Sequence, residues 1–312
     1  MLFRSIKIQK VFTNLHTLNW LEKLEPLRVL ILGSGVLLLL GMGITGITIL
    51  YKKRKGSGPL FSIRRFHRLL GYFVSFSLLF FAVSGIYHLL FMSISPPKSG
   101  MVLLEPLSLK HNNFSNTLSG LKNIPNQKLN NVSLIQGPNH QMYYRLSGAM
   151  NSEKKHHRFD GIPKEKTVTY INTTTGKQET LTDHKLAKFF AKKVLPKGAA
   201  IDKITRINRF GVFYDFRNKR LPVYRVDFNT PDKKAIFVDT ASGVIADTIT
   251  RTTRWVRFSF SFFHKWNFLR GPLGRTGRDI VMIVFLFGGI LLTIAGFILM
   301  IRRIQLSKRN DR

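Results

Sequence analysis

Histidine is the residue type with the widest choice of chemistry in this 312-residue chain, which contains nine histidines and no cysteine. Imidazole transfers protons near neutral pH and is a common metal ligand. His67 and His88 are 21 residues apart, which in one helix separates them by about 31 Å on roughly the same side. His16 and His264 each follow an apolar residue and have a tryptophan nearby. We take these four histidines as the candidate ligands.

Most other catalytic chemistry is missing from the sequence. Without cysteine there is no disulfide, thiolate nucleophile or iron–sulfur cluster. No HExxH, GxSxG or paired-carboxylate motif occurs, and Gly56-Ser57-Gly58 reads as a short linker rather than a phosphate-binding loop. The formal net charge of +33 would suggest nucleic acid. Much of that charge borders long apolar runs, however, and we expect no nucleic-acid partner.

Three apolar runs are long enough to cross a lipid bilayer: 29–51, 69–92 and 280–301. A helix needs ~20 apolar residues to cross the hydrocarbon core, and a buried helix of a soluble protein rarely stays apolar on all sides for so long. None of the runs contains Asp, Glu, Lys or Arg, which argues against an ion pump or a proton relay. The sequence therefore predicts a membrane protein with three transmembrane helices.

Basic residues indicate how these helices are oriented. Lys and Arg are concentrated in the loop 52–68 and in the tail 302–312, and the positive-inside rule places both in the cytoplasm. The N-terminal segment 1–28, the large segment 93–252 and the interfacial segment 253–279 then lie outside. Basic residues at the membrane borders would contact anionic lipid headgroups.

The first and third apolar runs resemble each other at a constant offset of 250 residues. Arg28 corresponds to Arg278, Gly46 to Gly296 and Lys52 to Arg302, and each copy has a histidine upstream. Such a repeat predicts two equivalent helices that flank the middle one, each with a histidine on the outer side.

The segment 93–252 has the pattern of an α+β domain. A helix is expected over 184–195, capped by Asp183 and ended by Pro196-Lys197-Gly198. Residues 93–130 read as a tether. The expected fold is one helix packed on a small antiparallel sheet, whose strands are predicted at 141–147, 167–172, 214–216, 221–228 and 235–239.

Several of these stretches resemble a known family. Leu221–Phe228, followed by Ala235–Asp239 and a turn at Gly243, resembles the PepSY domain, in which a PxYxVxF strand pairs with a strand ending in Val-Asp. The stretch 65–88 looks like the first helix of the PepSY-associated transmembrane family, and 263–303 looks like the helix after its outer domain. The N-terminal run departs from the usual order of that family.

The resemblance implies a location in the inner membrane and a haem cofactor, because the family includes haem-containing reductases of ferric siderophores. By topology His88, His264 and His16 lie near the outer interface, and two imidazoles from different helices can ligate haem iron axially. We expect haem b bound by His88 and His264, with His16 as the competing ligand. Arg275 or Arg278 would pair with the haem propionates.

His67 is open to two interpretations. It lies among three arginines, which suits contact with lipid headgroups, whereas the resemblance would make it a ligand of a second haem near the inner face. The chain offers no second inner histidine, so a dimer or a partner subunit would have to supply one.

Two functions remain as hypotheses. One is a haem-dependent reductase of a ferric siderophore or another anionic chelate, docked on the outer segment 98–251, which has 26 Lys and Arg against 12 Asp and Glu. The alternative is a non-enzymatic, membrane-anchored PepSY module that regulates a peptidase or binds an envelope component. In that case Leu221–Phe228 would be an edge strand that receives a strand of the partner.

Overall fold

The computed structural model describes residues 11, 13–52, 62–94, 102–103, 129–148, 161–162, 168–215 and 220–310. The chain divides into two compact units. We call Met1–Pro96 together with Phe258–Arg312 the helical unit, and Pro97–Arg257 the sheet unit.

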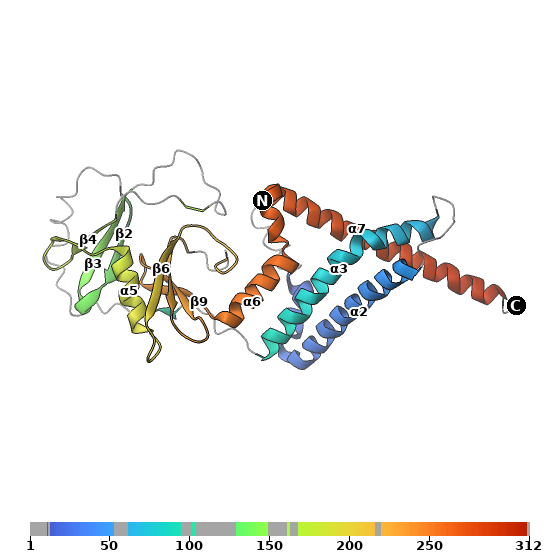
Figure 1. Cartoon of the computed structure of the whole chain (residues 1–312), viewed down its shortest axis with the longest axis horizontal. Coiled ribbons are helices and arrows are strands. Elements are labelled where there is room, and N and C mark those ends of the chain that lie inside the picture. The colour runs from blue at the N-terminus through green and yellow to red at the C-terminus, as the bar shows by residue number, and fades with distance from the viewer. Residues whose placement is uncertain are drawn as a thin grey trace. The chain divides into compact units, whose positions relative to one another are not determined.

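Three long helices form the helical unit (Figure 1). They are α2 (Glu25–Lys52), α3 (Ile63–Ile94) and α7 (Arg270–Asn310). All three are long and apolar enough to cross a membrane, which confirms the predicted helices. Each extends beyond its apolar run, because flanking residues such as Arg64 and Arg302 are good helix formers.

Helix α3 is the middle helix of this unit. It packs against α2 along one side and against α7 along another, and Figure 1 shows α2 beside α3 while α7 crosses it. In its apolar stretch 28% of the residues are buried, compared with 6% for α2 and 11% for α7. This is the arrangement that the internal repeat predicts.

Glycines allow the helices to approach closely. A Cβ atom added at Gly43 of α2 would lie 2.8 Å from Cδ2 of Leu79 on α3, and one added at Gly288 of α7 would lie 3.0 Å from Cγ2 of Val74. At either position a larger residue would force the facing side chain to shift. Small residues at helix contacts are the usual means of close packing between membrane helices.

A short irregular connection leads from the last strand to α7. It consists of α6 (Arg251–Ser259), the π-helical turn η5 (Phe260–His264) and the 3₁₀ turn η6 (Asn267–Leu269). Gly274 then has φ 67° and ψ −175°, a conformation that is essentially confined to glycine. The long part of α7 therefore begins after Gly274. A further 3₁₀ turn, η1 (Asn19–Leu24), precedes α2.

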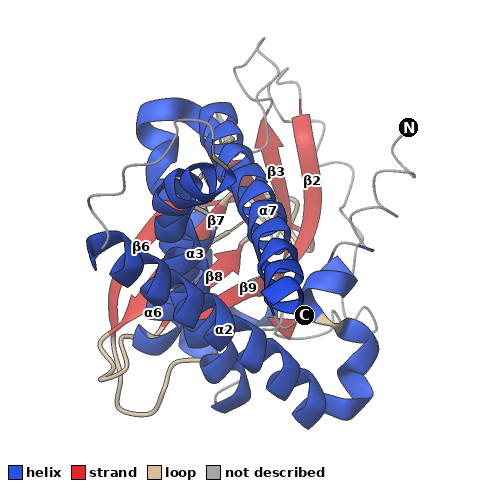
Figure 2. Cartoon of the chain, turned by 90° about the vertical axis from the view of Figure 1, so that its right-hand side faces the viewer, coloured by secondary structure: helices blue, strands red, loops and turns tan. Residues whose placement is uncertain are grey.

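The sheet unit contains two antiparallel sheets rather than the one that was predicted. In Figure 2, β7, β8 and β9 lie side by side, while β2 and β3 belong to the other sheet. One sheet has the order β1 (Val102–Leu103), β9 (Val244–Ile249), β8 (Ala235–Asp239), β7 (Val223–Phe228), β6 (Ile201–Ile207). The other has the order β2 (Leu129–Gln136), β3 (Met142–Gly148), β4 (Val168–Asn172), β5 (Gln178–Glu179), with the 3₁₀ turn η3 (Pro138–His140) between β2 and β3.

The predicted edge strand is an interior strand. Strand β7 is hydrogen-bonded to β6 on one side and to β8 on the other, so the expectation that Leu221–Phe228 lies at an edge is wrong. The strand that covers this edge is β6. It was not predicted from the sequence because Asp202, Lys203 and Arg206 make it highly polar.

The predicted strand at 214–216 is also wrong where the structure describes it. Tyr214 lies in a tight turn that bridges back to Gly211. Its ring stacks on Phe237 of β8 with 4.4 Å between the ring centroids. Tyr214 therefore covers one face of the five-stranded sheet.

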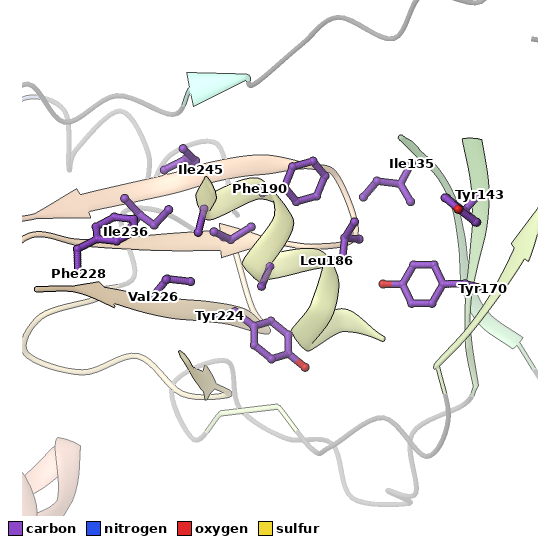
Figure 3. Close-up of a cluster of buried hydrophobic side chains, with 13 residues drawn as sticks. Ile135, Tyr143, Tyr170, Leu186, Phe190, Tyr224, Val226, Phe228, Ile236 and Ile245 are labelled. Carbon is purple, nitrogen blue, oxygen red and sulfur yellow. The ribbon is translucent and has the colours of Figure 1, made fainter. Parts of the chain in front are cut away.

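The opposite face of that sheet is covered by α5 (Asp183–Lys193), the predicted helix. Figure 3 shows Leu186 and Phe190 of α5 between Ile236 of the five-stranded sheet and Ile135 of the four-stranded sheet. One hydrophobic core thus joins both sheets and the helix.

Thr182, not Asp183, caps α5. The Thr182 hydroxyl accepts a hydrogen bond from the backbone N–H of Lys185 at 3.2 Å, the usual role of an N-cap residue. Asp183 is the first residue inside the helix, where its side chain points into the protein instead.

The Asp183 carboxylate is the centre of a buried polar network. Arg145 donates to both of its oxygens at 2.8 Å, and the Tyr170 hydroxyl donates to one of them. The Thr240 side chain also bonds to Asp183. Burial alone would raise the pKa of Asp183, but its bonds and charge interaction with Arg145 outweigh burial and lower the pKa. The network connects α5 to both sheets.

We predict that Asp183→Asn strongly destabilises the sheet unit. The variant leaves the charge of Arg145, which is 1% exposed, without its partner. Loss of one member of a buried ion pair typically costs about 3–5 kcal/mol. Urea unfolding of the full chain in detergent measures the loss, and Asp202→Asn, at an exposed carboxylate, is the control. Equal stability of the two variants would contradict the role of the network.

We predict that Gly43→Val disturbs the packing of α2 on α3, whereas Gly35→Val does not. A Cβ atom at Gly35 would meet no atom within 4 Å, so the two variants introduce the same side chain on the same helix in different surroundings. Overpacking a tight contact costs about 1–3 kcal/mol. Thermal unfolding in detergent, followed by circular dichroism, should show a lower midpoint for Gly43→Val only.

Candidate functional site

Three of the four candidate histidines come together in the helical unit. His16 belongs to a helical turn over 13–17, His88 lies near the end of α3, and His264 is the last residue of η5. The ring centroids of His16 and His264 are 5.9 Å apart. Residues at opposite ends of the chain thus meet at one end of the helix bundle.

Aromatic rings connect the histidines. The Phe260 ring stacks with both His264 and His88, at centroid distances of 4.7 and 5.4 Å. Phe81 of α3 meets the His264 ring edge to face at 5.4 Å and stacks on Trp266 at 5.8 Å. In the two expected ligand pairs, the His16 and His264 rings lie side by side, and Phe260 stacks on both His88 and His264.

The π-helical turn gives His264 its position. The backbone N–H of Lys265 donates to the carbonyl of Phe260 at 3.0 Å, an i to i+5 bond. Such turns are rare and frequently occur at functional sites. Trp266 follows with φ 50° and is 3% exposed. The chain thus reverses immediately after His264, with Trp266 buried beneath the turn.

Ser84 of α3 contacts His264 directly. Its hydroxyl oxygen lies 3.2 Å from Nδ1 of His264 and 3.0 Å from the carbonyl oxygen of Phe81. Ser84 is 1% exposed. A buried hydroxyl of the middle helix therefore holds one nitrogen of the imidazole.

The surroundings keep His264 neutral. Burial, together with repulsion from the imidazoles of His16 and His88 and from Lys265, lowers the pKa of His264 to about 4. A neutral imidazole keeps a lone pair on one nitrogen, which is the form that binds metals.

His67 lies in a different part of the helical unit. Its Nδ1 atom is 3.2 Å from the carbonyl oxygen of Leu292 on α7. A Cβ atom at Gly296 would lie 3.1 Å from Cε1 of His67, so the glycine makes room for the ring. His67 thus packs against α7, in the apolar part of the bundle.

Arg278 holds the turn that follows His264. It donates to the carbonyl of Lys265 at 3.2 Å and to Oδ1 of Asn267 at 2.6 Å, and it pairs with Asp279. Arg275 lies 3.8 Å from Asp279 and is 46% exposed in its side chain. Of the two arginines expected at the propionates, Arg278 is thus engaged in local structure, while Arg275 is on the surface.

The histidines suit an axial pair better than a conventional metal cluster. Among the described residues no group of three or more His, Cys, Asp or Glu side chains is close enough to bind a metal ion. A haem iron needs only two imidazoles. The imidazoles of His16 and His264, with ring centroids 5.9 Å apart, and that of His88 are the residues that would hold such a group. A pair of imidazoles is a donor set of the type that haem iron takes.

Comparison of the chain with protein-family models, curated proteins and solved structures finds no match in any of the three.

Several residues of this site escaped prediction from the sequence. Ser84 and Phe81 lie on the same helix as His88 and gave no signal of their own, because an apolar span with occasional small residues is common. Phe260 lies in a phenylalanine-rich stretch of the sequence, but its stacking on two histidines depends on the π-helical turn.

We predict that acidification destabilises the helical unit through His264. Its pKa is about 4 in the folded protein and about 6.5 when unfolded, so the unfolded chain binds more protons between these values. Stability is therefore complete above pH ~6.5 and falls as the pH drops toward 4, by about 2 kcal/mol between pH 7 and 5.

The measurement is the thermal midpoint by near-ultraviolet circular dichroism between pH 7 and 5. His264→Gln cannot be protonated and should show a smaller decrease than the unchanged protein. His184→Gln, at an exposed histidine of α5, is the matched control. An identical pH dependence in all three proteins would contradict the burial of a neutral His264.

Proposed function

We propose that this chain is a multi-pass inner-membrane protein that binds haem b and transfers electrons, related to the PepSY-associated transmembrane proteins. The observation that carries the proposal is the convergence of His16, His88 and His264 at one end of three helices that are apolar enough to span a membrane.

The surface of the long helices supports insertion into a membrane. Leu38 of α2 is 67% exposed, and Ile283 and Phe287 of α7 are 64% and 59% exposed. In water such surface would be costly at about 25 cal/mol per Å², whereas lipid tails remove the cost. The basic residues of segments 52–68 and 302–312 favour a cytoplasmic C-terminus, and with it an outer location for the three histidines.

The residues of the site have distinct parts in this proposal. His264 would be one ligand of the haem iron. His16, whose ring lies beside that of His264, or His88, which stacks on the same Phe260 ring, would be the second ligand. Phe81 and Trp266 provide an apolar wall. A bound haem supplies one-electron redox chemistry, and Arg275, at the surface, is the candidate partner for its propionates.

The substrate that this proposal favours is a ferric siderophore or another anionic ferric chelate. The sheet unit presents lysines on the outer face of α5, where Lys185, Lys188 and Lys192 are all exposed. Such a surface attracts anions from solution and raises their encounter rate. Reduction of Fe(III) to Fe(II) on the outer side takes one electron per iron, which a quinol or a partner protein would have to supply through the helical unit.

A second candidate function rests on the open edges of the sheets. In the described part of the sheet unit, β6 and β2 each have a paired neighbour on one side only. Either strand can receive an extended segment of a partner, which suits a membrane-anchored module that binds a peptidase or an envelope component.

The decisive measurement is the reduced-minus-oxidised absorption spectrum of the full chain in detergent, with a pyridine haemochrome assay for stoichiometry. We expect a b-type signal at one haem per chain. His264→Ala should lower bound haem at least tenfold, because it removes the ligand shared by both candidate pairs. His16→Ala and His88→Ala identify the second ligand, and His184→Ala is the control.

Absence of haem after expression with added haem would overturn this proposal and favour the binding module. An unchanged spectrum in His264→Ala would remove His264 from the site. A second haem per chain would assign a ligand role to His67.

A further inference from the structure

The contact between Ser84 and His264 raises the question of which atom carries the proton. Neutral imidazole has one N–H, on Nδ1 or on Nε2, and the other nitrogen carries a lone pair. Ser84 can accept from Nδ1–H or donate to a bare Nδ1. The two arrangements leave opposite forms of Nε2.

The geometry of Ser84 favours the first arrangement. Its only hydroxyl proton has an acceptor in the carbonyl oxygen of Phe81, 3.0 Å away and three residues earlier in α3. Serines inside helices commonly bond to the preceding turn in this way. Ser77, seven residues earlier on α3, likewise donates to the carbonyl of Val74 at 2.8 Å. The remaining lone pairs of Ser84 then face Nδ1 of His264, which must supply the proton.

We propose that Ser84 is a positioning residue that holds His264 as the Nδ1–H tautomer and leaves the lone pair on Nε2. If Ser84 donated to Nδ1 instead, the proton would sit on Nε2, and that nitrogen could not bind a metal. The significance of this tautomer for haem ligation rests on the proposed function. The tautomer itself is a property of the ligand-free protein. In metal sites, the partner of the second ring nitrogen commonly sets the tautomer in this way.

His67 provides a reference within the same molecule. Its Nδ1 faces the carbonyl oxygen of Leu292, and a carbonyl can only accept, so Nδ1 of His67 carries a hydrogen. The inference places His264 in the same form through a hydroxyl.

The test is ¹⁵N NMR of the haem-free full chain in detergent micelles at pH 7.5, labelled on histidine. The two neutral tautomers have distinct nitrogen shifts, and His264→Gln and His67→Gln assign the two signals. We expect the His264 signal to match that of His67. A signal of the Nε2–H form at His264 would overturn the inference.

An isosteric pair of variants isolates the hydroxyl. Ser84→Thr keeps it and Ser84→Val replaces it with a methyl group of the same shape, so only Ser84→Val should lose the pure Nδ1–H signal. If the Ser84→Thr and Ser84→Val variants do not fold, Ser84→Ala is compared with Ser77→Ala. Only Ser84→Ala should change the His264 signal. An unchanged signal in Ser84→Val or Ser84→Ala would overturn the role of Ser84.

This experiment separates the two proposals. The expected tautomer in a chain that never binds haem would refute the proposed function and leave the inference standing. The opposite tautomer in a chain that does bind haem would refute the inference alone.

Discussion

The helical unit depends on one constraint, the close approach of α3 to two neighbours at once. Glycines on α2 and α7 provide the space, and a side chain at Gly43 or Gly288 would have to displace Leu79 or Val74. The polar contacts of the bundle follow from that closeness. Ser84 reaches His264, and His67 reaches the backbone of α7 beside Gly296. In lipid, where no water competes, such contacts define which faces of the helices meet.

The sheet unit has a different organising centre. Arg145 and Tyr170 lie directly opposite each other on β3 and β4, and both converge on Asp183 at the start of α5. The hydrophobic core alone would allow the helix to slide between the sheets, because apolar contacts have no preferred direction. The bidentate Arg145–Asp183 pair is directional and so fixes the position of α5 on the four-stranded sheet. The bond from Thr240 to Asp183 connects the same network to the five-stranded sheet.

The sequence predicted those elements whose signal is local. Three uninterrupted apolar runs of about 20 residues have few alternatives to helices that cross a bilayer, and the buried strand at Ala235–Asp239 was predicted at its observed bounds. Strand β6 was missed because charged side chains dominate it. The division into two sheets could not be predicted, since it depends on which strands pair across long stretches of chain.

The candidate site shows the same limit. The four histidines were identified by residue type. Their approximate depth relative to the membrane was predicted from the topology. The closeness of the His16 and His264 rings, and the stacking of Phe260 on His88 and His264, depend on the π-helical turn at Phe260–His264 and on the left-handed backbone at Trp266. Neither feature has a distinctive sequence. The cap of α5 was misassigned by one residue because Thr182 and Asp183 are both good cap residues, and only the buried partner Arg145 distinguishes them.

The contact between His16 and His264 has a consequence for biogenesis. The two residues are 248 positions apart, so His16 cannot contact His264 until most of the chain has been synthesised. Arg278, near the start of α7, donates hydrogen bonds to Lys265 and Asn267 and so completes the turn that follows His264. The cluster of His16, His88 and His264 is therefore held in its final form only after the start of α7 has been made.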